Sequence, residues 1–258
     1  MSNFPLPNNA ADLSGDIAFV TGASSGLGRR FALVLAASGA TVVVTARRKT
    51  KLDELVQEIT AAGGKAVAIE MDVTDADSIL AAFQSAVDEV GIPTILINNA
   101  GIPDAKYVTQ MSVELIDAVI GTNLRGPFIL AAEFARRLIA EKRGGRIVNV
   151  ASMAAYRYDG SGAALYSITK AAVVRMTSAL SVEWAKFNIN VNGIAPGMFS
   201  SEMMDGMLER MGDLAARTPR KRIAQPAQMD STLLFLVSPA SDAVTGTTVK
   251  IDDGQGAK

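Results

Sequence analysis

The chain contains no cysteine and no histidine among its 258 residues. Without cysteine it can form no disulfide, no thiolate nucleophile and no cysteine–histidine zinc site. Without histidine it cannot assemble a Ser-His-Asp triad. Any side chain that moves a proton must therefore be Asp, Glu, Lys or Tyr, and we expect no metal centre.

A strong net charge and long apolar runs are also lacking. The formal net charge is −1, which leaves no basic field for a nucleic acid. The chain has no run of about 18 apolar residues, so we expect no membrane-spanning helix. The first 14 residues lack the basic and apolar segments of a secretory signal. We therefore expect a cytoplasmic protein that binds neither nucleic acid nor membrane.

What the chain does contain is alternation. Hydrophobic residues make up 49% of it, enough for one large core. Residues 1–14, with Pro5 and Pro7, predict a loose N-terminal arm, and residues 15–258 predict a single domain. Helical patterns separate nearly all of seven short apolar runs, which we interpret as strands at residues 17–20, 41–45, 66–71, 94–97, 146–150, 190–195 and 247–251.

Strands that alternate with helices predict a parallel sheet with helices on both faces. Right-handed crossovers then favour a Rossmann-type, doubly wound α/β sheet with the strand order 3-2-1-4-5-6-7. The predicted helices include residues 51–62, a long stretch 113–141 interrupted near 121–127, 163–186 and 227–237. Either Thr74 or Asp75 caps the helix that ends near residue 90, and the polar stretch up to residue 225 is predicted to be a mobile loop.

A glycine-rich turn at residues 21–28 follows the first strand and opens the first helix. Its glycines, Gly22, Gly26 and Gly28, are spaced G-x-x-x-G-x-G. Glycine lets the backbone turn sharply and approach a pyrophosphate, and the next helix presents its N-terminal N–H groups to the anion. This context favours a dinucleotide-binding turn. Gly22, Asn98, Ser152 and Pro196 each stand at or just after the carboxyl end of a predicted strand, the edge where such sheets bind ligands.

Tyr166 and Lys170 are four residues apart and therefore lie on one face of a helix. A nearby ammonium favours the phenolate, so the pair is expected to have a tyrosine pKa well below its ordinary value of ~10. Such a pair can exchange a proton with a substrate near neutral pH.

These motifs, in this order and spacing, resemble the short-chain dehydrogenase/reductase family over nearly the whole chain. The matching positions are 21–28, Asp72, 98–101, Asn123, Ser152, Tyr166, Lys170, Pro196 and Gly197. The resemblance implies that Tyr166 is the acid/base, Lys170 binds the nicotinamide ribose and lowers the tyrosine pKa, and Ser152 hydrogen-bonds the substrate oxygen. Asn123 is implied to hold a water on the proton relay.

The resemblance also implies the remaining sites. The expected cofactor-binding residues are Gly22, Ser24, Ser25, Gly26, Leu27, Gly28, Arg47, Arg48, Asp72, Val73, Asn99, Ala100, Gly101, Tyr166, Lys170, Pro196, Gly197, Met198 and Ser200. The expected substrate-lining residues are Met153, Tyr156, Tyr158, Met198, Phe199 and Met203. This mostly apolar set favours a hydrophobic ketone or secondary alcohol.

Two departures from the family pattern concern this region. Ser152 and Tyr166 are fourteen positions apart instead of the usual thirteen, which indicates one extra residue in the loop 158–162. The family often has a threonine after Pro196-Gly197, and here either Ser200 or Ser201 must contact the nicotinamide.

The end of the second strand bears on the choice of cofactor. Ala46 stands where NAD-dependent members usually carry aspartate, and Arg47 and Arg48 follow. A guanidinium pairs well with a 2′-phosphate, so NADP(H) is predicted, with NAD(H) as the alternative. The turn itself has Ser24 and Ser25 but no basic residue, which weakens this prediction.

Other functions remain open. One is reduction of 3-oxoacyl thioesters, although the family's carrier-docking arginines align with Ile129 and Phe187. The basic run 217–222 suits an acidic carrier or a coenzyme A phosphate, or is a solvated face. Another is a cofactor-binding regulator without turnover. The resemblance implies a homotetramer built on the helices 123–141 and 163–186, with Ala171, Ala172, Met176 and Leu180 as outward-facing candidates.

Overall fold

A computed structural model describes residues 12–160 and 162–257. Seven strands form one sheet with the order β3-β2-β1-β4-β5-β6-β7, and every neighbouring pair is parallel. The strands are β1 Ile17–Thr21, β2 Thr41–Ala46, β3 Lys65–Glu70, β4 Ile95–Asn98, β5 Gly145–Val150, β6 Ile189–Pro196 and β7 Thr248–Ile251. The predicted doubly wound topology is confirmed.

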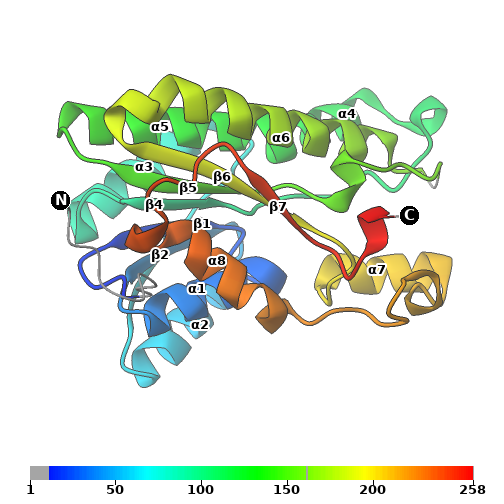
Figure 1. Cartoon of the computed structure of the whole chain (residues 1–258), viewed down its shortest axis with the longest axis horizontal. Helices are drawn as coiled ribbons and strands as arrows, with labels where there is room; N and C mark the ends of the chain where they lie inside the picture. The colour runs from blue at the N-terminus through cyan, green and yellow to red at the C-terminus, as the bar shows by residue number, and fades with distance from the viewer. Residues whose placement is uncertain (1–11, 161, 258) are drawn as a thin grey trace.

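Helices cover both faces of the sheet (Figure 1). The lower face in Figure 1 carries α1 Gly26–Ala37, α2 Lys49–Ala61 and α8 Asp230–Val237. The upper face carries α3 Ala76–Val90, α5 Gly126–Ala140 and α6 Ala164–Trp184, with α4 Val113–Ile120 running into α5. Of the two predicted caps of α3, Asp75 is the one found, since its carboxylate accepts from the Asp77 N–H at 2.9 Å.

The core lies in two layers because successive strand residues point to opposite faces. In β1, Ala18 and Val20 pack into the cluster under α1, α2 and α8, whereas Phe19 packs into the cluster under α3, α5 and α6. All three side chains are fully buried. Strands buried on both faces explain the continuous apolar runs in the sequence.

The stretch Val113–Ala140 is, among the described residues, the one helix long and apolar enough to cross a membrane by length and composition. Its Leu130, Phe134 and Leu138 pack against the sheet in the second core cluster. A π-helical turn, Gly121–Arg125, joins α4 to α5 at the predicted interruption.

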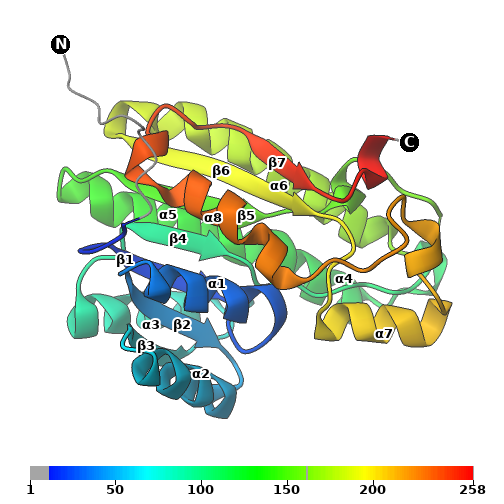
Figure 2. The ribbon, with the colours of Figure 1, turned by 60° about the horizontal axis from the view of Figure 1, so that its bottom comes forward.

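Two expectations about helices were wrong. The stretch predicted as a mobile loop contains α7 Glu202–Met211, which lies beyond the carboxyl ends of the strands (Figure 2). Met176 and Leu180 do not face outward, because they belong to the face of α6 that packs on the sheet. The exposed large apolar residues of α5 and α6 are instead Phe128, Ile168 and Val182.

The predicted arm falls mainly outside the described residues. Of its last three residues, Leu13 is buried and its N–H donates to the carbonyl of Ser38 at 2.8 Å.

Candidate active site

A cavity of about 1700 Å³ opens at the carboxyl edge of the sheet. It joins residues from both halves of the chain that the sequence singled out. Those among its lining are Gly22, Ser24, Ser25, Gly26, Leu27, Arg47, Arg48, Asp72, Val73, Asn99, Ala100, Gly101, Ser152, Tyr166, Lys170, Pro196, Gly197 and Met198. The predicted convergence at this edge is therefore present in the structure.

The glycine-rich turn packs directly against the end of β4. The Asn99 side-chain amide donates to the carbonyl of Thr21 at 2.9 Å, and the Asn99 and Ala100 N–H groups each donate to the Thr21 hydroxyl at 3.0 Å. A Cβ on Gly28 would lie 2.4 Å from both the Asn99 Nδ2 and the Gly22 carbonyl oxygen. Gly28 therefore lets the turn close against β4 and does not itself line the cavity.

The N-terminus of α1 opens into this cavity. Its N-cap, Ser25, makes no side-chain capping hydrogen bond, and Gly26 has a positive φ of 54°. The first N–H groups of a helix have no intrahelical acceptor and carry a partial positive charge, which suits a phosphate. The turn thus fits the pyrophosphate of a dinucleotide.

Arginines border the far end of the turn. The Arg48 guanidinium donates to the Ser24 and Ser25 hydroxyls, each at 2.9 Å from Nη2, and pairs with Glu202 at 3.0 Å. The ion pair links the turn to the start of α7, and it holds the pKa of Glu202 below its ordinary value. Both side chains are exposed, so the pair is open to solvent and salt.

Asp72 and Arg47 lie on the same side of the cavity. The Asp72 carboxylate accepts from the N–H and the hydroxyl of Thr74, at 2.9 and 2.8 Å. The Thr74 N–H is the main cause that lowers the Asp72 pKa, and the charge of Arg47 adds to it. Arg47 thus stands exposed beside a carboxylate that is ionised at neutral pH.

Tyr166 and Lys170 lie on one face of α6, as their spacing predicts. The Lys170 Nζ lies 5.6 Å from the centroid of the Tyr166 ring. Lys170 is only 4% exposed, and its ammonium donates to the carbonyl of Val150 at the end of β5, at 2.8 Å. Burial lowers the pKa of Lys170 from 10.5 to about 8.

The expected direction of the tyrosine pKa was wrong. Burial raises the Tyr166 pKa above 10.0, a hydrogen bond with the Ser152 side chain opposes this, and the charge of Asp104 raises it further. Lys170 is not among the causes. The physical reason is that desolvation disfavours the phenolate, while the ammonium is turned toward the Val150 carbonyl.

Ser152 follows β5 and extends toward the start of α6. Its hydroxyl accepts from the Ala154 N–H at 3.1 Å and takes part in the hydrogen bond to the Tyr166 side chain. Ser152 and Tyr166 thus form a pair of hydroxyl groups at one wall of the cavity.

Asn123 does not line the cavity. It lies in the π-helical turn, where its side-chain oxygen accepts from the Ile102 N–H at 2.9 Å. Its amide donates to the Ile102 carbonyl at 3.0 Å and the Thr169 hydroxyl at 3.3 Å. A Cβ on Gly101 would lie 3.4 Å from both the Asn123 oxygen and the Lys170 Nζ, so Asn123 still borders the lysine through Gly101.

The substrate side is formed by residues after β5 and β6. Met153, Tyr158, Met198, Phe199 and Met203 line the cavity. Tyr156, expected on this side, and Ser200, expected at the nicotinamide, do not line it. The ring of Tyr156 lies under the Lys250 ammonium, at 4.2 Å, and Ser200 donates its N–H to the Ala224 carbonyl at 2.9 Å. Ser201 lines the cavity instead, and its hydroxyl caps α7 by accepting from the Met204 N–H at 3.2 Å.

Comparison with known families identifies the chain. The model of the short chain dehydrogenase family matches residues 16–211. The chain belongs to the short-chain dehydrogenase family. It is an NAD(P)-dependent oxidoreductase that acts on the CH–OH group and interconverts alcohols and ketones.

Its relatives act on different substrates. The chain is 36% identical to a 3-oxoacyl-(acyl-carrier-protein) reductase of Thermotoga maritima over 94% of this chain and 98% of that one. It is 34% identical to a 2-dehydro-3-deoxy-D-gluconate 5-dehydrogenase of Dickeya dadantii, over 95% and 97%. A solved structure of a gluconate 5-dehydrogenase from Burkholderia cenocepacia in complex with NADP and tartrate has a TM-score of 0.91 and 31% identity, and covers 98% of this chain and 99% of that one.

In this short-chain dehydrogenase, residues of α7 line the cavity; sequence reasoning placed the substrate near residues 198–208 but missed that they form a helix and that Arg210 belongs to the lining. Glu202, Met204, Met207 and Arg210 all line the cavity from this helix, and Arg217 follows it. The signals were present: Ser201 is a good N-cap residue, and the spacing of the apolar residues 203, 204, 207 and 208 is typical of a helix.

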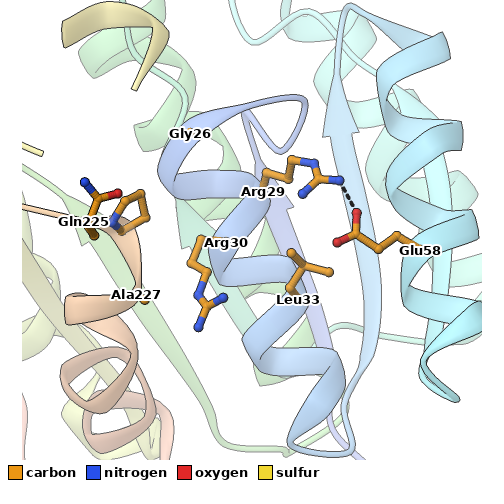
Figure 3. Close-up of a pocket in the computed structure, with 8 residues that line it drawn as sticks. Gly26, Arg29, Arg30, Leu33, Glu58, Gln225 and Ala227 are labelled. Carbon is orange, nitrogen blue, oxygen red and sulfur yellow. Dashed lines mark hydrogen bonds and ion pairs between the residues drawn. The ribbon is translucent and has the colours of Figure 1, made fainter. Parts of the chain in front are cut away.

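A second, smaller cavity of about 370 Å³ lies between α1, α2 and the segment before α8 (Figure 3). Arg29 points toward Glu58 and forms an ion pair with it, and Arg30 pairs with Asp230. Both cations are thus already partnered. Within the described residues no group of three or more Asp or Glu side chains could hold a metal ion.

Proposed function

We propose that this short-chain dehydrogenase interconverts a hydrophobic ketone and the corresponding secondary alcohol with NADP(H). The observation that carries the proposal is one cavity in which the phosphate-binding turn, the Arg47–Arg48 pair and the Ser152–Tyr166–Lys170 group meet. When bound, the cofactor supplies or accepts the hydride. The residues of the chain supply the proton and hold the reacting oxygen.

Tyr166 is the proton donor in the direction of reduction. A phenol whose pKa is raised by burial stays protonated at neutral pH and is ready to donate to a developing alkoxide. Ser152 places a second hydroxyl at the same oxygen, so donors are already oriented before the charge develops. Lys170, held at the Val150 carbonyl, adds a buried positive charge near that oxygen and is placed to bind the nicotinamide ribose. Asn123 is proposed to hold a water beside Lys170.

The choice of NADP rests on charge. Arg47 and Arg48 both line the cavity at the end of β2, where Ala46 offers no carboxylate to a ribose 2′-hydroxyl. Solved relatives hold NADP or NADPH. We propose that Arg47 binds the 2′-phosphate directly, with Arg48 next to it.

The apolar side chains of the substrate side support a hydrophobic substrate. Six methionines line the cavity, and five of them come from the segments after β5 and β6, together with Phe199 and Leu214: Met153, Met198, Met203, Met204 and Met207. Methionine adapts to irregular apolar ligands. Such a surface suits a hydrophobic ketone better than the sugar acid named for the Dickeya relative.

A second candidate is reduction of a 3-oxoacyl thioester, the activity of the Thermotoga relative. An apolar acyl chain would fit the methionines, and Arg217 lines the cavity rim. Ile129 and Phe187, however, stand where the carrier-docking arginines are expected and pack against the core in part. A regulator without turnover is the third candidate, and the complete Ser152–Tyr166–Lys170 group speaks against it.

We also propose a cytoplasmic homotetramer. Phe128, Ile168 and Val182 are 52, 63 and 80% exposed on α5 and α6, and such apolar residues favour burial by another copy. Solution scattering at micromolar concentration is expected to give a tetrameric mass, and a monomeric mass would refute this part of the proposal.

A panel of hydrophobic ketones, sugar acids and 3-oxoacyl thioesters, assayed with NADPH and with NADH by absorbance, tests the function. We expect the fastest turnover with a hydrophobic ketone and NADPH. Faster turnover of a thioester bound to carrier protein than of any free ketone would establish the second candidate, and a panel with no turnover but tight NADPH binding would favour the regulator.

A further inference from the structure

Asp104 is a buried acidic residue that has no role in the proposed reaction described above. It lies in the loop after β4 and is only 4% exposed. A carboxyl group is rarely buried unless it forms hydrogen bonds. Its two oxygens are both engaged: Oδ1 accepts from the Ala105 N–H at 2.7 Å, and Oδ2 accepts from the Tyr166 N–H at 2.9 Å.

The bond to Tyr166 fills a gap at the start of α6. The helix begins at Ala164, and its N-cap, Ala163, has no side chain that can accept a hydrogen bond. Tyr166 is the third residue of the helix, so its N–H has no acceptor within the helix. Asp104, 62 positions earlier in the chain, supplies that acceptor.

The same contact joins two loops that border the reacting groups. Pro103 and Ala105, on either side of Asp104, line the cavity, and Ala105 has a positive φ of 49°. A Cβ on Gly162, just before α6, would lie 3.4 Å from the backbone of Lys106. The loop after β4 therefore packs against, and is hydrogen-bonded to, the N-terminus of the helix that carries Tyr166.

We propose that Asp104 is a positioning residue of this enzyme: it caps α6 at the Tyr166 N–H and thereby places a negative charge near Tyr166. The inference rests on the proposed acid role of Tyr166. This charge disfavours the phenolate, so the pH at which Tyr166 can act as the base in alcohol oxidation is raised.

Other charges near the phenol are few among the described residues. Lys170 lies on the same helix, one turn away, and its Nζ contacts the Val150 carbonyl. Arg157 and Asp159 line the cavity from the loop between β5 and α6. Of these charges, that of Asp104 acts on the ionisation of Tyr166.

The test measures Tyr166 itself and needs no substrate. The ultraviolet absorbance of tyrosinate is titrated with pH in the wild type, in Asp104→Asn and in Asp104→Ala. Each is compared with the same protein carrying Tyr166→Phe, so that the difference reports Tyr166 alone. Asn keeps one acceptor and removes the charge, whereas Ala removes both.

We expect Tyr166 to ionise at a lower pH in both Asp104 variants than in the wild type. With an active substrate, the pH profile of alcohol oxidation is expected to move in the same direction. Asp104→Ala is also expected to lower kcat by about 10–100-fold through misplacement of the phenol, and Asp104→Asn by less.

Asp75→Asn is the matched control. Asp75 caps α3 through a carboxylate–amide bond of the same 2.9 Å length, on a helix that carries none of the reacting groups. It is expected to leave the Tyr166 titration unchanged. An unchanged titration in folded Asp104→Asn, or an equal shift in Asp75→Asn, would overturn the proposal.

If the Asp104 variants do not fold, hydrogen exchange in the wild type tests whether Asp104 holds the Tyr166 N–H. The Tyr166 N–H is expected to exchange more slowly than the N–H groups of Ala164 and Leu165 in the same first turn. Exchange as fast as theirs would show that Asp104 does not hold it. The Tyr166 titration and the hydrogen-exchange measurement use no substrate. They can therefore be interpreted even if the ketone panel gives no turnover.

Discussion

The two ends of the active-site cavity hold charge in opposite ways. At the proposed catalytic end Lys170 is 4% exposed, and its ammonium donates to a backbone carbonyl. At the proposed phosphate-binding end the side chains of Arg48 and Glu202 are 49 and 62% exposed and pair with each other. The Lys170 charge is therefore largely shielded from solvent, whereas solvent screens the Arg48–Glu202 pair.

This difference determines how much a single group matters. A buried charge changes pKa values and costs free energy, because the low local dielectric strengthens every interaction. An exposed ion pair contributes little on its own and weakens in salt. Substitutions at the catalytic end are therefore expected to have large, salt-independent effects, and those at the phosphate end smaller, salt-dependent ones.

The largest effect is expected for Tyr166→Phe. The change removes one hydroxyl and keeps the ring, so the packing survives. General acid catalysis typically contributes ~10²–10⁴-fold, and kcat for ketone reduction is expected to fall at least that far. Calorimetry should give a nearly unchanged Kd for NADPH, since the turn at Gly22 and Gly26, and not Tyr166, is the proposed phosphate site. Near-normal reduction by this variant would remove the proposed mechanism.

Lys170→Met tests the cost of burial. The wild-type lysine binds its proton more weakly in the folded state, with a pKa of about 8, than in the unfolded state, at 10.5. Below pH 8 the folded state therefore carries a penalty of about 3 kcal/mol, which is relieved as pH rises toward 10.5. We expect the variant to lose activity and NADPH affinity.

The variant is also expected to unfold at higher denaturant concentration than the wild type at pH 7. This advantage should shrink between pH 8 and 10.5, when denaturant unfolding is compared across that range. A wild type that is more stable at pH 7 would show that the hydrogen bond to Val150 outweighs the desolvation of the ammonium.

Arg47→Asp probes the exposed end. It removes a partner of the 2′-phosphate and supplies an acceptor for a 2′-hydroxyl. We expect the ratio of kcat/KM for NADPH to that for NADH to fall by about 10–100-fold, the size of a charge-assisted hydrogen bond. Arg29→Asp serves as the control, because Arg29 lies in the cavity of Figure 3 and not in the large one. If this NADPH/NADH ratio is unchanged in Arg47→Asp, Arg47 does not bind the 2′-phosphate.

The smallest effect is expected for Glu202→Gln. Glu202 and a 2′-phosphate compete for the Arg48 guanidinium, so removal of the carboxylate charge should tighten NADPH binding two- to five-fold, as expected for an exposed pair. Fluorescence titration at low salt measures the gain, which should vanish in high salt. Glu209→Gln, an exposed residue of the same helix, should change nothing. A gain in NADPH affinity that persists in high salt would show that solvent and salt do not screen the Arg48–Glu202 pair.

The sequence alone determined what depends on near neighbours. Apolar runs of a few residues separated by helical patterns determined the seven strands, since a strand buried on both faces must be apolar throughout. The glycines at 22 and 26 permitted the sharp turn, because both adopt a positive φ, 65° and 54°, which glycine tolerates without steric cost. The spacing of Tyr166 and Lys170 determined that they share a helix face.

Tertiary structure decided the environment of these residues. The Tyr166 pKa rises instead of falling because burial and the charge of Asp104 act from other segments of the chain. Ser201, and not Ser200, faces the cavity because α7 begins there. Glu202 reaches Arg48 across 154 positions. Burial and long-range charge depend on how distant segments pack, and a local pattern of residues does not contain that information.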